Sequence, residues 1–323
     1  MAEEAGFPLV VRPDARSLSE GATVRDWIGR NHDKLLDMLH TPGAVLFRGF
    51  PRTSREDFEA VCSLVSGELL DYEYRSNNRR RLSGNLFNST EYPATETLPF
   101  HNEMSYFSVW PRHVWFMCEV PAAKGGATPL ADSREVYRRL PEEVRERFER
   151  HGVLYSRMIS PDLDLTWQDV FNTEDRSEVE EYCRRFGIQW EWVDSDRLRT
   201  RQIRPATMAH PVTREQVWFN QAHLFHPSAL GPEIHDWLLR KYGESGLPRS
   251  AYYGDGAPIE PEVLDLIRRT YDDLAVPVRW EAGDVLAFDN VFYAHSRDSF
   301  EPPRRIVVGM GGTGGALPAP AKV

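Results

Sequence analysis

The sequence is poor in cysteine, has no long apolar run and carries no excess of positive charge. Its 323 residues include only three cysteines. Cys62, Cys118 and Cys183 are far apart and form no Cys-x-x-Cys pair, which argues against a disulfide framework and against a structural zinc site. No apolar stretch approaches the ~18 residues of a membrane-spanning helix. The formal net charge of −10 argues against a broad surface for nucleic acid or for an anionic membrane.

Targeting segments and linkers are missing as well. The N-terminus has neither the basic nor the apolar region of a signal peptide, so we expect a cytoplasmic protein with reduced thiols. No low-complexity or Gly/Ser-rich linker interrupts the chain, and 37.2 kDa is enough mass to bury a substantial core. These observations predict a single domain over residues 1–323.

Against this background, two histidines and one glutamate form a candidate metal site. His101 and Glu103 are separated by one residue, and in an extended strand such side chains leave the same face. A third ligand must come from elsewhere in the chain, and His295 fits if its strand lies opposite. Two imidazoles and one carboxylate are the ligand set of non-haem Fe(II) oxygenases, and they leave about three coordination positions open.

Each part of this pattern also has an ordinary explanation. An isolated His-x-Glu pair is usually surface polarity, and a lone histidine such as His295 is usually structural. His223 and His226 would suggest a second metal site, but no nearby carboxylate completes one, which favours packing or capping. Their order along the chain, with Arg304 and Arg305 following His295, favours metal binding by the first three residues, because a dicarboxylate co-substrate needs an arginine.

Helices are predicted mainly in the middle of the chain. Ser54 and Asp57 resemble a capping box that begins a helix with apolar residues at helical spacing. Further helical patterns run from Asp132 or Ser133 to Leu140, from Pro141 to about Gly152, and over 177–186, 232–242 and 261–274.

Strands are predicted near both ends. Short apolar runs at 43–50 and 113–120, and three more at 276–280, 285–288 and 306–310, read as strands, with His295 just after the fourth of these five. Strands at both ends with helices between them predict a mixed α+β fold, a double-stranded β-helix (jelly-roll) core with helical insertions.

Several motifs in order resemble one known family. They are Gly43-Ala-Val-Leu-Phe-Arg-Gly-Phe50, His101-Asn-Glu-Met-Ser-Tyr106, Gly125-Gly-Ala-Thr-Pro-Leu-Ala-Asp132, Phe219-Asn-Gln-Ala-His-Leu-Phe-His226, Tyr252-Tyr-Gly-Asp-Gly256 and Gly283-Asp-Val-Leu-Ala-Phe-Asp-Asn290 through Arg305. The set is similar to the TauD/TfdA family of Fe(II)/2-oxoglutarate dioxygenases, and within it to the SyrP-like and clavaminate-synthase-like branch. The resemblance implies a core of about residues 40–310 and a flexible tail at 311–323.

The resemblance also implies roles for particular residues. His101, Glu103 and His295 align with the iron ligands, Thr128 with the residue that hydrogen-bonds 2-oxoglutarate, and Arg305 with the arginine that clamps its distal carboxylate. Arg304 is then expected to face outward, since neighbours in a strand alternate. Many family members have aspartate where this chain has Glu103. A carboxylate here argues against a halogenase, which needs that coordination position for chloride.

The implied cofactors are Fe(II), 2-oxoglutarate and O2, and the implied reaction is hydroxylation of an unactivated C–H bond, with desaturation or epoxidation as alternatives. A non-catalytic metal-binding or 2-oxoglutarate-binding jelly roll is a further alternative. The substrate would be a small molecule such as an amino acid, free or tethered to a peptidyl carrier protein, in natural-product biosynthesis. Candidate substrate contacts are the polar residues near these motifs: Arg75, Ser89, Thr90, Glu91, Asn220 and Gln221.

Overall fold

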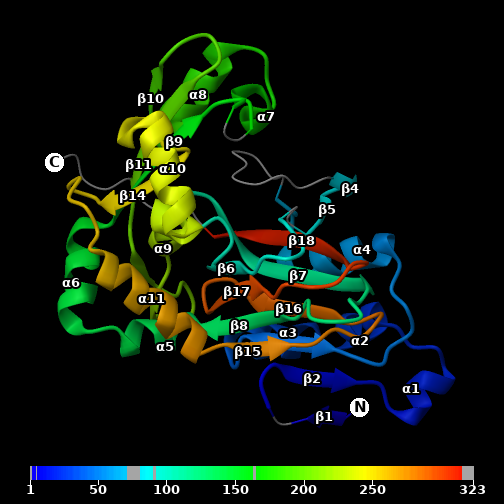
Figure 1. Ribbon diagram of the computed structural model, residues 1–323. Helices are drawn as coiled ribbons and strands as arrows, with labels where there is room; N and C mark the ends of the chain where they lie inside the picture. The colour runs from blue at the N-terminus through cyan, green and yellow to red at the C-terminus, as the bar shows by residue number, and fades with distance from the viewer. Residues whose placement is uncertain (1, 5, 71–80, 90–91, 163–164, 315–323) are drawn as a thin grey trace.

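The core of the protein consists of two facing β-sheets (Figure 1). The structure is a computed structural model that describes residues 2–4, 6–70, 81–89, 92–162 and 165–314. Within these residues an eight-stranded major sheet has the order β1-β2-β3-β16-β7-β18-β5-β4, and a four-stranded minor sheet has the order β15-β8-β17-β6. The mixed α+β architecture with a jelly-roll core agrees with the prediction from the sequence.

The strands of the two sheets come from distant parts of the chain. The major sheet contains β1 (Ala2–Glu4), β2 (Leu9–Arg12), β3 (Ala44–Phe47), β4 (Arg81–Ser83), β5 (Leu86–Asn88), β7 (Trp110–Val120), β16 (Val285–Asp289) and β18 (Arg305–Gly314). The minor sheet contains β6 (Leu98–His101), β8 (Thr128–Asp132), β15 (Val276–Val278) and β17 (Tyr293–Arg297). Its pairings are all antiparallel, whereas β2 and β3 pair in parallel.

The major sheet is buried on both faces. Val114, Phe116 and Cys118 of β7 belong to the core between the sheets, whereas Trp115 and Met117 belong to a second core on the outer face. That outer core also contains apolar residues of α2 (Val24–Arg30), α3 (His32–His40) and α4 (Arg55–Ser66), which follow the short α1 (Ala15–Ser19). Because side chains alternate along a strand, a strand buried on both faces is apolar throughout and shows no alternation in its sequence.

A smaller unit is inserted between β8 and β15. It contains a four-stranded antiparallel sheet of β9 (Val153–Ile159), β10 (Gln189–Trp192), β11 (Leu198–Arg204) and β14 (Arg249–Tyr253), and the hairpin of β12 (Thr207–Ala209) and β13 (Gln216–Trp218). Its helices are α5 (Ser133–Arg139), α6 (Glu142–His151), α7 (Trp167–Phe171), α8 (Arg176–Phe186), α9 (Ala222–Phe225), α10 (Pro232–Tyr242) and α11 (Pro261–Asp273), with 3-10 turns η1 (Pro227–Leu230) and η2 (Glu244–Gly246). In Figure 1 much of this unit, including the four-stranded sheet, stands at one end of the two-sheet core.

The predicted helices are confirmed, and two strand predictions are corrected. Ser54 caps α4, since its Oγ accepts from the Asp57 amide and donates to the Asp57 carboxylate. His295 lies within a strand, β17, and not after one. Residues 311–314, expected in a flexible tail, extend β18 and pair with β7 as far as Trp110. Residues 315–323 lie outside the described residues. In the part of the chain that is described, no helix has both the length and the apolar character needed to cross a membrane.

Strand β16 lies in the middle of the major sheet, and we expect it to limit the stability of the core. Leu286 pairs with Leu46 on one side and Phe116 on the other and is fully buried. Leu286→Ala should lower the free energy of unfolding by about 2–5 kcal/mol, because it removes apolar contacts and leaves a cavity. The control Leu64→Ala, at a side chain 49% exposed on α4, should change it by less than about 0.5 kcal/mol. Urea denaturation measures both, and equal effects would contradict this account of the core.

Candidate active site

The three candidate metal ligands meet inside the jelly roll. One ligand atom from each of His101, Glu103 and His295 lies within 4.8 Å of the others. His295 Nε2 is 3.9 Å from Glu103 Oε2, and the two imidazole rings are 4.3 Å apart. All three residues are buried, with 4%, 3% and 4% of their surfaces exposed, in the order of the chain. Among the described residues this is the one group of three or more such side chains placed to hold a metal ion.

Strand pairing brings the two histidines together. His295 in β17 is the direct antiparallel partner of His101 in β6, so both side chains lie on one face of the minor sheet. On its other side His295 pairs with Leu130 of β8, which places Thr128 on the same face two residues away. The ring of His295 packs against Phe116 and Phe288 of the major sheet. The strand of His295 is therefore the neighbour of the His101 strand and does not lie opposite it.

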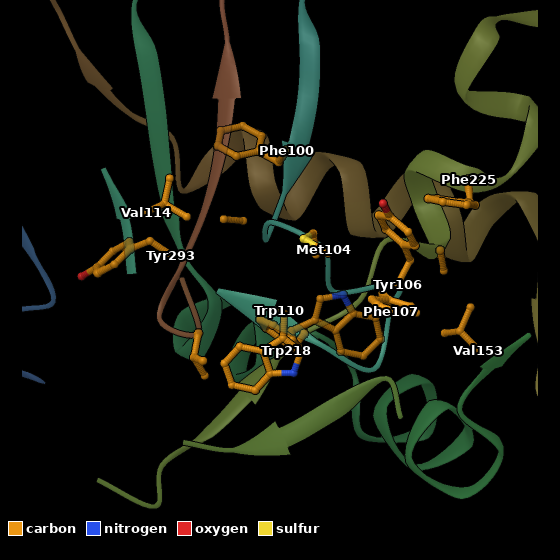
Figure 2. Close-up of a cluster of buried hydrophobic side chains, with 14 of the residues drawn as sticks. Phe100, Met104, Tyr106, Phe107, Trp110, Val114, Val153, Trp218, Phe225 and Tyr293 are labelled. Atoms are coloured by element: carbon orange, nitrogen blue, oxygen red, sulfur yellow. The ribbon is translucent and has the colours of Figure 1, made fainter. Parts of the chain in front are cut away.

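Glu103 is positioned by a turn and not by strand alternation, which corrects the sequence-based explanation of the His-x-Glu spacing. Strand β6 ends at His101, and residues 103–106 form a turn in which Met104 has a positive φ of 57°. Figure 2 shows Met104 and Tyr106 in the turn after β6, with Tyr106 close to Phe225. This aromatic packing fixes the turn that carries the carboxylate.

Asn290 fixes the main chain of Glu103. Its Oδ1 accepts from the Glu103 amide at 2.6 Å, and its Nδ2 donates to the carbonyls of Glu103 at 2.9 Å and Pro111 at 2.8 Å. The side chain of Asn102 donates in turn to the Asn290 carbonyl. Asn290 lies between β16 and β17, so these bonds tie the Glu103 turn to both sheets.

The geometry and chemistry of the group fit an Fe(II) ion. Nδ1 of His101 lies 2.9 Å from the Pro99 carbonyl, an arrangement in which Nδ1 carries the proton and Nε2 keeps its lone pair for a metal. Two imidazoles and one carboxylate on one side of an ion leave the other positions for a bidentate ligand and O2. A structural zinc site would normally have a fourth protein ligand, and within the described chain none joins the three.

Next to the metal ligands, Thr128 and Arg304 line one wall of a cavity that also contacts His295. Thr128 Oγ1 accepts from Trp280 Nε1 at 3.0 Å and from Arg304 Nη2 at 3.3 Å. Both contacts use the oxygen as acceptor, so the hydroxyl proton can be donated to a bound carboxylate. Arg304 Nε also donates to the Gly126 carbonyl at 3.0 Å. Gly126 has a φ of +70°, and a Cβ there would lie 3.0 Å from Arg304 Cδ, so glycine permits this approach.

Arg304 replaces Arg305 as the arginine that faces the co-substrate cavity. The interior residues of β18 are Ile306, Val308 and Met310, and Arg304 has the same parity. Arg305 points to the outer face, where its side chain is 68% exposed and lies 3.6 Å from Glu119. The prediction that Arg305 faces inward and Arg304 outward is therefore wrong. The alternation was applied correctly, but its phase was reversed.

Arg304 carries an unusual charge for a buried side chain. Burial, with a smaller contribution from the positive charge of Arg297, lowers its pKa to about 10, so it remains a cation at neutral pH. No carboxylate within the described residues forms an ion pair with it. A buried cation needs an anionic partner, and a dicarboxylate co-substrate would provide one.

Arg297 is a second arginine at this cavity, and the sequence analysis missed it. It lies in β17 two residues after His295 and donates to the carbonyls of Tyr92 at 3.0 Å, Pro93 at 2.7 Å and Glu96 at 2.8 Å. These bonds hold the segment that leads into β6, the strand of His101. The position of Arg297 on the same strand as His295 was the available signal, but no motif distinguished it.

The remaining predicted residues have varied positions. Ser89 lines the co-substrate cavity. Gln221 donates from Nε2 to the Asn102 carbonyl and from its amide to Tyr155 Oη, both at 2.8 Å, and so supports the main chain between two metal ligands. The side chain of Asn220 bonds to the main chain at Ala206 and Ala222. Arg75, Thr90 and Glu91 lie outside the described residues.

His223 and His226 have structural surroundings. His223 Nε2 lies 2.8 Å from the Phe100 carbonyl, and burial lowers the pKa of His223 to about 3, so the ring is neutral. His226 Nδ1 accepts from the Ser228 amide at the start of η1. Neither belongs to the group of candidate metal ligands.

Comparison with known proteins gives the family context of this geometry. The family model "Taurine catabolism dioxygenase TauD, TfdA family" matches residues 12–310. The "Dapdiamide synthesis protein DdaC" of Enterobacter agglomerans is 38% identical over 280 residues, covering 87% of this chain and 85% of the relative. The "Clavaminate synthase-like protein At3g21360" of Arabidopsis thaliana is 31% identical over 323 residues, covering 95% and 94%.

Solved structures share the fold. PvcB of Pseudomonas aeruginosa superposes with a TM-score of 0.55 at 16% identity, covering 94% of this chain and 85% of PvcB. A second structure describes PvcB as "an Fe, alpha-ketoglutarate dependent oxygenase from an isonitrile synthetic pathway".

The two arginines at the start of β18 give a paired test of the co-substrate cavity. Arg304→Gln should weaken 2-oxoglutarate binding by about 10- to 150-fold, since it removes charge-assisted hydrogen bonds worth about 1.5–3 kcal/mol. The matched Arg305→Gln should change it by less than about twofold, because exposed charges contribute little. Calorimetric titration of 2-oxoglutarate into anaerobic Fe(II)-loaded protein measures both. A larger loss in the Arg305 variant would restore the sequence-based assignment.

Asn290→Asp tests the link between the Glu103 turn and the sheets. Aspartate keeps the acceptor for the Glu103 amide but loses the two donated bonds and places a second negative charge beside Glu103. We expect a loss of about 1–3 kcal/mol in stability and a lower iron content after dialysis. Asn31→Asp is a matched control, since Asn31 Nδ2 also donates to a carbonyl, that of Trp27, but between outer helices. Iron retention equal in the two variants would show that Asn290 does not position Glu103.

Proposed function

The chain belongs to the TauD/TfdA family of dioxygenases, and from this premise we propose that it hydroxylates an unactivated C–H bond of an amino acid or an amino-acid-derived metabolite. It is an Fe(II)/2-oxoglutarate-dependent oxygenase that consumes O2. The observation that carries the proposal is the meeting of a buried His101, Glu103 and His295 group with Thr128 and Arg304 at one cavity.

We assign one task to each group. His101, Glu103 and His295 would hold the iron, while Arg304 and Thr128 would bind the distal carboxylate of 2-oxoglutarate. When bound, iron and 2-oxoglutarate supply the oxidative decarboxylation that makes an unactivated C–H bond reactive. The protein orients the groups and, through Phe116 and Phe288 beside His295, keeps water from that side of the site. No protein general base is required, so we assign none.

The proposed substrate class is supported by the face of the inserted sheet that carries Tyr155. Tyr155 bonds to Gln221, which bonds to Asn102 between two of the metal ligands. Two residues along β9 on the same face is Arg157, 2% exposed, and its direct partner in β14 is Arg249. The guanidinium of Arg249 also lies over the ring of Phe225, which packs against Tyr155. Guanidinium groups pair well with carboxylates, which favours a substrate with a carboxylate.

The setting of the reaction is part of the same proposal. The printed name of the 38% identical relative places that relative in dapdiamide synthesis, which favours natural-product biosynthesis here. Cys62, Cys118 and Cys183 are free and buried, which favours a reducing compartment such as the cytoplasm. The substrate would be presented either free or as a thioester on a peptidyl carrier protein. Desaturation and epoxidation remain alternative outcomes of the same site.

A substrate panel tests the proposal. Amino acids and their amides, free and carrier-tethered, are incubated with Fe(II), 2-oxoglutarate, ascorbate and O2, while succinate and product mass are measured. We expect succinate formation coupled to a product that gains one oxygen atom, with acids preferred over amides. A product that loses two hydrogen atoms would indicate desaturation, and oxygen gain restricted to alkenes would indicate epoxidation.

Two variants complete the design. His295→Gln should abolish succinate formation and lower iron content, because it removes a ligand. His235→Gln alters a histidine on α10 that does not belong to the metal-binding group and should leave both unchanged. Absence of succinate formation by iron-loaded wild-type protein with every member of the panel would exclude the proposed substrate class.

A further inference from the structure

A second arginine-lined recess lies on the outer side of the major sheet, away from the metal ligands. It is lined by Arg52, Thr53, Ser54, Arg55, Glu119 and Arg305, which we call the outer arginine pocket, and offers about 320 Å³. These residues come from the segment between β3 and α4, from the end of β7 and from the start of β18. Small-molecule sites commonly occupy about 300–1,000 Å³. The recess is therefore large enough for a small ligand.

The pocket carries more positive than negative charge. Three arginines face one glutamate, so the lining has a formal charge of 3 − 1 = +2. Arg55 binds both carboxylate oxygens of Glu119, at 2.6 and 2.9 Å, and Arg52 donates to the Glu119 carbonyl at 2.8 Å. The hydrogen bond from Arg55 lowers the pKa of Glu119, so this carboxylate stays ionised and anchors Arg55. The remaining N–H groups of the arginines can face a ligand.

A hydroxyl and a helix terminus add further donors. Thr53 is 8% exposed, and its Oγ1 has no hydrogen-bond partner in the described structure. Helix α4 begins directly after Ser54 and has 12 residues, so its N-terminus contributes partial positive charge. Ser54 already caps the Asp57 amide, and Asp57 pairs with Arg25. The Asp57 charge is thus compensated on the other side of this turn.

We propose that the outer arginine pocket binds the phosphate group of a small phosphorylated metabolite. A phosphate monoester carries about −1.5 to −2 charges at neutral pH and three acceptor oxygens. That charge matches the pocket, and guanidinium groups bind phosphate oxygens with two parallel hydrogen bonds. A buried hydroxyl and the N-terminus of a helix complete a set of donors typical of phosphate sites.

This site is distinct from the co-substrate cavity although the two share a strand. Arg304 lines the inner cavity, whereas the next residue, Arg305, lines the outer pocket. The pairing of β18 with β7 shifts register between Arg305 and Ile306. A phosphate bound to Arg305 would therefore act on the segment that places Arg304. By reciprocity, any effect on 2-oxoglutarate affinity must equal the effect of 2-oxoglutarate on phosphate affinity.

Glycerol 3-phosphate is a suitable probe for a calorimetric test. The titration uses anaerobic Fe(II)-loaded protein saturated with 2-oxoglutarate, so that the inner cavity is occupied. We expect saturable binding of one equivalent by the wild type. The double variant Arg52→Gln/Arg305→Gln should weaken binding by about tenfold or more, while Arg305→Lys keeps part of the affinity through its charge. A double variant Arg16→Gln/Arg197→Gln has the same change in charge at exposed surface pairs and should bind as the wild type does.

Separate arms use inorganic phosphate and succinate in place of glycerol 3-phosphate. Weaker binding of inorganic phosphate at the same residues supports a phosphorylated metabolite as the ligand, whereas equal or tighter binding identifies the free ion and overturns that choice. Succinate binding as tight as that of glycerol 3-phosphate would overturn the choice of phosphate. No saturable binding by the wild type, loss of affinity in both double variants alike, or binding only when 2-oxoglutarate is omitted would overturn the site itself. Thermal melts confirm that each variant is folded.

Discussion

The hydrogen bonds between Asn290 and Glu103 are the interaction on which the geometry of the site depends. The iron-binding histidines are placed by strand pairing, but Glu103 lies in a turn that no sheet register fixes. Asn290 holds both the amide and the carbonyl of Glu103, and it lies between β16 of the major sheet and β17 of the minor sheet. These bonds are buried, where an unmade hydrogen bond costs most. The carboxylate is thus tied to the same connection that joins the two sheets.

Buried positive charge is the second constraint. Arg297 and Arg304 line one cavity beside His295, and each lowers the free-energy cost of its burial by donating to main-chain carbonyls. Those carbonyls belong to the segment before β6 and to the Gly125-Gly126 turn before β8, so the arginines also order the two neighbours of β17. A dianionic co-substrate would compensate the charge that remains. Arg305 experiences a different environment, since Glu119 and solvent surround it on the outer face.

Local rules in the sequence were reliable where one residue pattern has one structural solution. The cap at Ser54, the proline at the start of α10 and the glycine after its end define their helices as predicted. The same rules failed for β17, whose sequence Tyr-Ala-His-Ser-Arg has no apolar alternation because it carries site residues. They failed for Glu103 as well. A spacing of two residues fits a strand, but it fits a turn held by a distant asparagine equally well.

The sequence by itself determined the ligand types and their order, His101, Glu103, His295 and then an arginine, because chemistry restricts which side chains bind iron and a dicarboxylate. It also determined the alternation of strands and helices that makes a mixed fold. Only the tertiary structure decided that Arg304 faces the cavity and Arg305 the outer pocket. Strand β18 is buried on both faces, with Ile306 and Val308 in one core and Val307 in the other. Apolar residues at every position leave no alternation from which the phase of the strand could be predicted.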